Sequence, residues 1–268
     1  MSRSRPDSRW HSASYRRRRR SPLPVVIFLA ALVILVFVLF QLFRPHAEAG
    51  ADATPAIVPS QVPSAAPSTS PTLSPLSDAP WYLTLANLDH PLPSDWEIET
   101  VTLANGLEVD ARIVSALDQM MDDCRAAGLS PMVCSGYRTV TRQTELFQEK
   151  IDELMVDGLT YDEAYTAAAT VVAIPGTSEH NLGLAVDICA TDYQLLDDAQ
   201  AETPEQQWLM EHCAEYGFIL RYPQGKEEIT GIIWEPWHYR YVGVEAATEI
   251  MQSGLCLEEY LAQYYSGV

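Results

Sequence analysis

The chain has 268 residues and is acidic, with 17 lysine and arginine residues against 36 aspartate and glutamate residues. The length would allow more than one domain, but the first 80 residues lack a globular composition, so only the remainder can form a core. The charges are also divided: residues 1–44 hold nine arginines and one acidic residue, which leaves eight basic and 35 acidic side chains for the rest. The two parts are therefore expected to face different surroundings.

An apolar span follows the N-terminal arginines. Arg16–Arg20 come shortly before residues 25–43, which contain a single polar side chain. Such a span is long enough to cross a bilayer, and the positive-inside rule keeps the arginines cytoplasmic. We predict a basic cytoplasmic tail (residues 1–24), a transmembrane signal-anchor (residues 25–43) and an extracytoplasmic remainder, in a single-pass protein of the cell membrane. Because the span follows at once, nucleic-acid binding by the arginines is not expected.

A cleaved signal peptide is the alternative to an anchor. Ala47–Ala49 resembles a cleavage site, although the apolar span is longer than the apolar region of most signal peptides. Residues 44–80 are then rich in Ala, Ser, Thr and Pro, with a proline at every fourth position from Pro55 to Pro75. No core can form from this composition. We predict a polyproline-biased linker with a reach on the order of 100 Å at about 3.1 Å per residue, followed by a folded domain over residues 81–268.

Within that domain the sequence predicts helices grouped before and between a few strands. Apolar residues at the spacing of one helix face, and Thr203-Pro204 as a cap and first helical residue, mark the helices. The expected helices are Val109–Ala127, 141–156, Tyr161–Ala173, one beginning at Pro204, Ala246–Gln252 and Leu257–Tyr264. The expected strands are Trp81–Leu85, Pro131–Ser135, Leu184–Ile188, Phe218–Leu220 and Trp237–Val242. Without a regular βαβ alternation, this order favours an α+β fold.

Five cysteines in an exported domain suggest disulfides, with one cysteine unpaired within the chain. A helix that returns into a strand can bring Cys124 and Cys134 together, so this pair is favoured. Cys213 with Cys256 is the second candidate pair.

Two candidate metal ligands, His180 and Asp187, lie in Pro175–Ile188, whose sequence is P-G-T-S-E-H-N-L-G-L-A-V-D-I. The first half has the composition of a turn, and the second half is a short apolar strand that contains one carboxylate. Burial of an ionised aspartate in such a strand is costly unless the carboxylate is paired or binds a metal. We therefore expect a cation beside Asp187.

A third candidate ligand, His238, opens the aromatic run that follows Glu235 and Pro236. Two histidines and one carboxylate form a three-ligand set for zinc that leaves a fourth position open for water, as catalytic sites require. Pro236 argues against a helix here, so a turn must bring Glu235 to the site, where it would be the base. Glu179 is the rival candidate for the base. Cys189 as a soft ligand is disfavoured because the ligand set is already complete.

Three segments together resemble the signatures of VanY-type D-alanyl-D-alanine carboxypeptidases. They are Ser-x-His-x-x-Gly-x-Ala-x-Asp at 178–187, Glu-x-Trp-His at 235–238, and Ser-Gly-Tyr-Arg-Thr at 135–139. The resemblance runs from about Trp81 to the C-terminus. It implies a small, mainly antiparallel sheet with flanking helices and a zinc site in a cleft.

The resemblance also implies a zinc peptidase that acts on peptidoglycan stem peptides. The zinc ligands would be His180, Asp187 and His238, and the catalytic base would be Glu235. Arg138 would contact the substrate, either at its terminal carboxylate, which suits a bidentate fork, or at the tetrahedral oxyanion. Ser178, Tyr137 and Trp237 are further candidates for substrate contacts.

Three functions are compatible with these residues. The first is a membrane-anchored zinc D,D-carboxypeptidase that hydrolyses the terminal D-alanyl-D-alanine bond of stem peptides. The second is an L,D-carboxypeptidase that acts on tetrapeptide stems. The third is a non-catalytic cell-wall-binding module with the same fold, which the complete ligand set and Glu235 disfavour.

Overall fold

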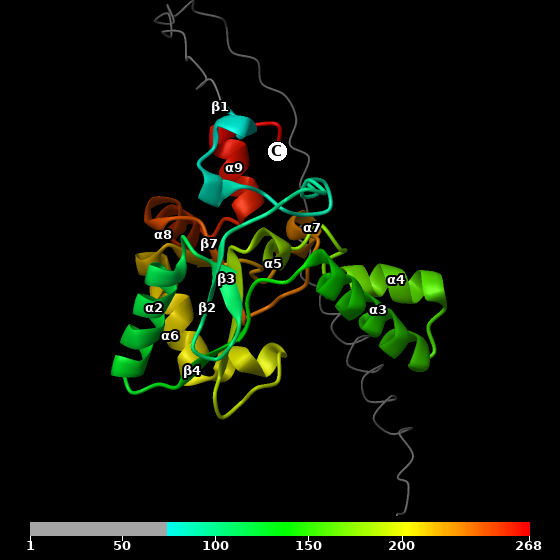
Figure 1. The fold of residues 1–268 in the computed structure, drawn as a ribbon, viewed down its shortest axis with the longest axis horizontal. Coiled ribbons are helices and arrows are strands. Elements are labelled where there is room, and N and C mark those ends of the chain that lie inside the picture. Colours follow the sequence, from blue (N-terminus) through cyan, green and yellow to red (C-terminus); the bar gives the residue numbers. More distant parts are fainter. Residues whose placement is uncertain (1–73) are drawn as a thin grey trace, which may run out of the picture. The chain divides into compact units, whose positions relative to one another are not determined.

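The computed structural model describes residues 74–268, and these residues surround a four-stranded antiparallel sheet in the order β4-β5-β7-β6 (Figure 1). The strands are β4 (Pro131–Ser135), β5 (Ala185–Ala190), β6 (Phe218–Leu220) and β7 (His238–Tyr241). All six residues of β5 are buried, because this central strand has neighbours on both edges and side chains over both faces. The expected α+β fold with a small antiparallel sheet is confirmed.

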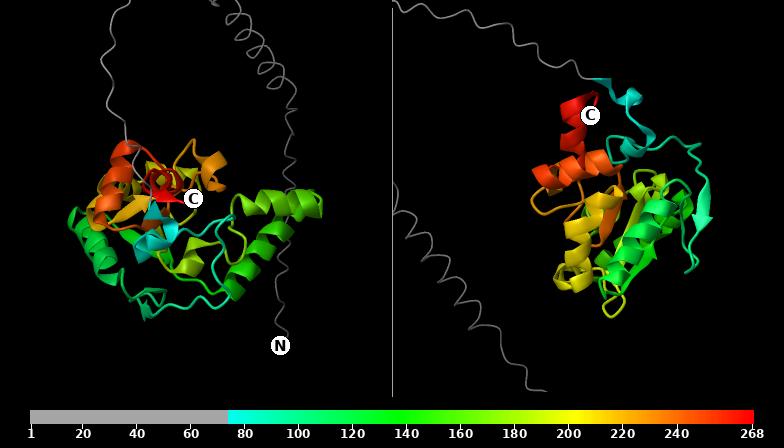
Figure 2. Two further views of the ribbon diagram at one scale, coloured as in Figure 1. Left: turned by 90° about the horizontal axis from the view of Figure 1, so that it is seen from above. Right: turned by 90° about the vertical axis from the view of Figure 1, so that its left-hand side faces the viewer.

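The helices gather at several sides of this sheet. They are α2 (Val114–Ala126), α3 (Val140–Val156), α4 (Tyr161–Ala169), α5 (Glu179–Leu182), α6 (Pro204–His212), α7 (Glu227–Thr230), α8 (Val244–Ser253) and α9 (Leu257–Tyr264). Short 3-10 helices are η1 (Leu76–Asp78), η2 (Trp81–Leu83), η3 (Asp198–Glu202) and η4 (Cys213–Tyr216). Figures 1 and 2 show α2 and α6 together at one side, and α3 with α4 as a hairpin at the other.

Two small strand pairs complete the fold. β2 (Thr100–Thr102) pairs antiparallel with β3 (Glu108–Asp110), and β1 (Ser74–Pro75) pairs in parallel with β8 (Tyr265–Ser266). We expected the folded domain to begin at residue 81. It begins earlier, because β1 pairs at 74–75 and Leu76 packs against a buried cluster. Over residues 74–268 no helix has the length and apolarity needed to cross a membrane, and the span expected at 25–43 lies outside the described residues.

Three hydrophobic clusters hold these elements. The largest joins the sheet to α2 and α6 and includes Ile113, Met120, Ile188, Leu209 and Tyr239. A second lies between β6, α8 and α9, and a third lies within the α3–α4 hairpin. The caps that the sequence provides also form: the Thr203 side chain accepts from the Gln206 amide at the start of α6, which satisfies one of the free N–H groups there.

The expected strand at Trp81–Leu85 is wrong. Residues 81–83 form the 3-10 helix η2, in which the Trp81 and Tyr82 rings pack against Tyr241. The Arg240 guanidinium donates to the carbonyls of Tyr82 and Thr84, at 3.0 and 2.7 Å. A strand would use such carbonyls in a ladder, so the buried arginine explains the irregular backbone.

Two helices are shorter than expected. Glu108–Asp110 is strand β3, so the helix expected from Val109 begins at Val114, and the helix expected to reach Ala173 ends at Ala169.

The expected disulfides are also wrong, because all five cysteines, which lie in the described part of the chain, are free thiols. Cys124 is fully buried on α2, whereas the Cys134 Sγ lies 3.4 Å from the Asp187 carbonyl oxygen on the next strand. Cys213 packs in the large cluster around the sheet, and Cys256 caps α9. The helix-to-strand return therefore does not aim the Cys124 and Cys134 side chains at each other.

Candidate active site

His180 is presented by the single-turn helix α5. The Ser178 hydroxyl caps this turn by accepting from the His180 amide at 3.2 Å. Gly183 ends it at φ 86°, a left-handed conformation that favours glycine, and a Cβ there would clash with the Ile98 side chain. The chain can therefore turn sharply from His180 into β5, which carries Asp187.

Asp187 and His238 are brought together by strand register. They are paired residues on the antiparallel neighbours β5 and β7, and Asp187 is also paired with Ser135 on β4. Directly opposite side chains on one face of a sheet lie close to each other. The sheet thus sets the distance between two of the three expected ligands.

The three expected ligands form one buried group. Donor atoms of His180, Asp187 and His238 lie within 4.8 Å of one another. His180 Nε2 is 3.2 Å from Asp187 Oδ2, and His238 Nδ1 is 3.1 Å from Asp187 Oδ1. The Asp187 carboxylate lies between the two imidazole rings, with one oxygen facing each ring, and the buried Oδ1 is left without a hydrogen bond in the described part of the chain. Such a group fits a bound cation, and two histidines with one carboxylate fit zinc.

The charges in this group are strongly coupled. Burial alone would raise the pKa of Asp187, but the two histidines hold it well below its usual range. Burial alone would lower the pKa of His238, but Asp187 and Glu179 raise it to about 9, whereas burial and Arg138 lower that of His180 to about 4. The two histidines therefore favour the ionised form of Asp187.

The Ser135–Thr139 segment supports His180 from behind. The Gly136 carbonyl oxygen lies 2.8 Å from His180 Nδ1, which leaves Nε2 to face Asp187. A Cβ at Gly136 would collide with the Glu108 carbonyl oxygen, so glycine lets β3 pass close by. A hydrogen bond on the remote ring nitrogen fixes the tautomer of a metal-binding histidine.

Glu235 reaches the site through a turn, as the sequence predicts. The His238 amide donates to the Glu235 carbonyl at 3.2 Å, which closes the turn, and Glu235 Oε2 lies 3.6 Å from His238 Nδ1. Burial raises the pKa of Glu235 to about 8, and the nearby Asp187 adds to this rise. A cation bound beside it would favour the ionised carboxylate, which is the form that a general base needs.

Arg138 contacts the ligand group directly. Its Nη2 donates to Asp187 Oδ2 at 2.8 Å, its Nε donates to Ser135 Oγ at 2.9 Å, and its Nη1 donates to Gln143 Oε1 at 3.3 Å. The side chain is 20% exposed. Arg138 is therefore held rigidly and still opens onto the cavity.

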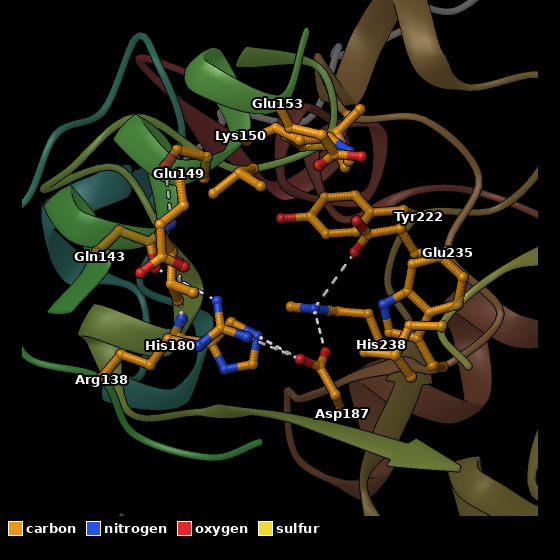
Figure 3. A pocket seen from close by; sticks show the side chains of 18 residues that line it. Arg138, Gln143, Glu149, Lys150, Glu153, His180, Asp187, Tyr222, Glu235 and His238 are labelled. Atoms are coloured by element: carbon orange, nitrogen blue, oxygen red, sulfur yellow. Dashed lines mark hydrogen bonds and ion pairs between the residues drawn. The ribbon is translucent and has the colours of Figure 1, made fainter. Parts of the chain in front are cut away.

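These residues line a cavity of about 340 Å³ (Figure 3). Of the three candidates for substrate contacts, Ser178 and Trp237 line this cavity, whereas Tyr137 is not among its lining residues within residues 74–268. Glu179 also lies outside the lining, and its carboxylate accepts from two buried arginines. Of the two candidates for the base, Glu235 faces the cavity and Glu179 does not.

Among the lining residues that sequence reasoning missed, Tyr222 and Gln143 contact residues of the site directly. The Tyr222 ring lies 4.8 Å from the His238 ring, and Gln143 connects Arg138 to the Ala173 carbonyl oxygen. Gln143 is a fully buried amide on α3, and nothing in the sequence separates it from an exposed helix residue. Tyr222 lies in the sequence Arg-Tyr-Pro, which matches no motif that would indicate a site residue.

A buried ligand set for one metal, with a glutamate and an arginine beside it in an open cavity, defines a mononuclear metallopeptidase-type site. A family model described as VanY, D-alanyl-D-alanine carboxypeptidase, matches residues 106–244. The chain belongs to this VanY family.

Relatives and solved structures agree with this membership. A D-alanyl-D-alanine carboxypeptidase of Enterococcus faecalis (strain ATCC 700802 / V583) is 49% identical over 183 residues, which cover 68% of this chain and 66% of that protein. The crystal structure of a point mutant of the vancomycin resistance D,D-pentapeptidase VanY, in complex with Zn(II), has 48% identity and a TM-score of 0.63, and covers 68% of this chain and 99% of that one. The structure of the LdcB LD-carboxypeptidase has 32% identity and a TM-score of 0.59, and covers 69% of this chain and 86% of that one.

Proposed function

We propose that this protein is a zinc-dependent D,D-carboxypeptidase that removes the terminal D-alanine from peptidoglycan stem peptides. The observation that carries the proposal is the assembly of His180, Asp187, His238, Glu235 and Arg138 around one cavity. The choice of D,D over L,D activity is supported by the 48% identity to the D,D-pentapeptidase VanY, against 32% to the LD-carboxypeptidase LdcB.

Each residue has a role in hydrolysis that its position supports. Zinc held by His180, Asp187 and His238 would supply a Lewis acid that activates water and polarises the scissile carbonyl. Glu235 accepts a proton from the attacking water as the new C–O bond forms. It then passes that proton to the leaving nitrogen as the C–N bond breaks. The products are the shortened peptide and free D-alanine.

In this proposal Arg138 stabilises the charge that develops at the reacting carbonyl. The support is that Arg138 donates to Asp187 Oδ2, an oxygen of an expected metal ligand, and lines the same cavity. The alternative is a clamp on the terminal carboxylate of the substrate, a role that suits the bidentate fork of a guanidinium. Both roles are open to this side chain, and a peptide without a terminal charge separates them.

We also propose that residues 25–43 anchor the protein in the cell membrane, with the N-terminus cytoplasmic and the catalytic domain outside. The support is the apolar span after Arg16–Arg20 and the proline-rich segment that would hold the domain away from the bilayer. Fractionation of cells, followed by protease treatment of intact protoplasts, tests this. Recovery of the full chain from the soluble fraction would overturn the anchor.

The activity is tested with the full chain and three synthetic stem peptides, with products identified by mass spectrometry. A pentapeptide ending in D-Ala-D-Ala should lose one alanine, and a tetrapeptide should be a poor substrate. Faster cleavage of the tetrapeptide would make the enzyme an L,D-carboxypeptidase, and no cleavage of either by zinc-loaded protein would make it a binding module. The amidated pentapeptide should be cut about 10 to 100 times more slowly if Arg138 clamps the terminus, the loss expected from one charge-assisted hydrogen bond.

A further inference from the structure

A buried network of charged side chains lies behind the metal site. Arg221 Nε and Arg240 Nη1 both donate to the same oxygen of Glu179, Oε1, at 2.7 and 2.8 Å. All three side chains are 0% exposed. Arg221 also forms a two-bonded pair with Glu258 on α9, at 2.9 and 2.6 Å. Two arginines thus face two glutamates in the interior, and both guanidinium groups leave the second oxygen of Glu179 free.

That second oxygen faces His238. Glu179 Oε2 lies 3.7 Å from His238 Nε2, and both atoms are buried without a hydrogen-bond partner among residues 74–268. Unpaired buried polar atoms are costly and rare. Here an acceptor and a ring nitrogen face each other just beyond hydrogen-bond distance, so a small movement of the His238 ring would pair them.

The two ring nitrogens of His238 face different partners. Its Nδ1 is the nitrogen that faces the site, at 3.1 Å from Asp187 Oδ1. An imidazole that binds a metal through Nδ1 must carry its proton on Nε2. His180 shows the mirror arrangement, with Nε2 toward Asp187 and Nδ1 at 2.8 Å from the Gly136 carbonyl oxygen. Each histidine therefore has one acceptor behind it: a carbonyl for His180 and a carboxylate for His238.

We propose that Glu179 is a positioning residue that holds His238 in the Nε2-protonated form and thereby presents Nδ1 to the metal. The two arginines fix the carboxylate through Oε1, so that Oε2 is aimed at the ring. Glu179 acts through His238 and does not touch the substrate, in keeping with its place outside the cavity lining. The inference rests on the zinc site of the proposed function.

The variants that test this role differ in one respect each. Glu179→Gln keeps an oxygen for the arginines but can turn an amide NH₂ toward His238 Nε2, which favours a proton on Nδ1. Glu179→Asp keeps the charge between the arginines and withdraws the carboxylate from the ring. Glu258→Gln is the matched control, because it removes a carboxylate from the same network without facing His238.

Zinc affinity is measured for the full chain by competition with a chromogenic chelator, together with thermal unfolding. Loss of such a carboxylate behind a metal-binding histidine typically weakens metal binding about 10- to 100-fold. We expect this loss for Glu179→Gln and Glu179→Asp, with Glu258→Gln within about threefold of the parent. Equal affinity of both Glu179 variants and the parent would overturn the role, as would an equal loss in Glu258→Gln. If Glu179→Gln does not fold, Glu179→Asp alone decides.

A spectroscopic readout separates positioning from general stability. In the zinc-loaded parent, nitrogen NMR of labelled histidines should show His238 protonated at Nε2, with a hydrogen-bonded proton resonance that shifts in Glu179→Asp and persists in Glu258→Gln. Protonation of His238 at Nδ1 in the zinc-loaded parent would overturn the proposal. A parent protein that binds no zinc would instead reject the zinc site itself, so the two failures are distinct.

Discussion

The two sides of the cavity are built in different ways. The sheet side carries Asp187 and His238 on paired strands, backed by Glu179, Arg221 and Arg240, whose side chains are fully buried. The other side is the face of α3, where Glu149 and Glu153 are each 63% exposed and form ion pairs with exposed or partly exposed partners. Loss of one partner of a buried charge pair typically costs about 3–5 kcal/mol, whereas an exposed pair contributes about 0–1 kcal/mol.

The hydrophobic core behind the sheet side is also larger than the core behind the α3 side. The sheet belongs to the largest hydrophobic cluster, whereas the α3–α4 hairpin has a cluster of four buried residues, Phe147, Ile151, Ala164 and Ala168. A small separate core gives a local unit that can open more easily than the rest of a protein. We therefore expect the sheet side to fix the positions of the ligands and the exposed face of α3 to contribute less to the site. Substitutions on the two sides should then have effects of different kinds.

The largest effect is expected from loss of a ligand on the rigid side. His180→Ala should abolish zinc binding and activity, because it removes one of only three protein donors in the described site. The measurement is metal content after dialysis. His212→Ala is the matched control, because this partly exposed histidine pairs with Glu215 on the protein surface. Full zinc content in His180→Ala would reject the ligand assignment.

The next effect concerns the base. Glu235→Gln should keep its zinc and lose turnover by a factor of about 10² to 10⁴, the usual contribution of general acid–base catalysis. Steady-state kinetics on the pentapeptide, with metal content measured in parallel, tests this. Glu149→Gln changes a carboxylate in the same cavity but on α3, so its turnover should stay near that of the parent. A near-native kcat in Glu235→Gln would mean that another group is the base.

The smallest effect is expected on the α3 side. Lys150 lines the cavity and pairs with Glu153 at 2.9 Å, with its side chain 25% exposed. Lys150→Ala should change kcat/KM by less than about fivefold, since an exposed ion pair contributes at most about 1 kcal/mol, and any change should lie in KM. If Lys150→Ala lost as much activity as Glu235→Gln, the two sides of the cavity would not differ in the way described.

The sequence could predict those features that depend on local patterns along the chain. Several elements around the site were predictable, because β4, β6 and α9 follow local patterns of apolar residues and caps, and their bounds match expectation. The strands that carry Asp187 and His238 were also expected, with bounds that differ by one or two residues. The ligands were predictable from the spacing of two histidines, an aspartate and a glutamate in segments with a family resemblance.

The buried ion network was not predictable. Its members Glu179, Arg221, Arg240 and Glu258 lie on four separate segments, and in each segment a charged residue is typical of an exposed position. Only the fold shows that they meet. The same network explains why the strand predicted at Trp81–Leu85 is wrong, because Arg240 binds backbone carbonyls of that segment. The disulfide prediction failed for a related reason, since spacing along the chain does not give side-chain direction.

The central claim is that one zinc ion binds through His180 Nε2, an oxygen of Asp187 and His238 Nδ1. A crystal structure of the zinc-loaded protein, with anomalous diffraction recorded on both sides of the zinc absorption edge, tests it most directly. One strong peak should lie about 2.0–2.2 Å from each of these three atoms, with Glu179 within hydrogen-bond distance of His238 Nε2. A peak at another site, or coordination of His238 through Nε2, would contradict it.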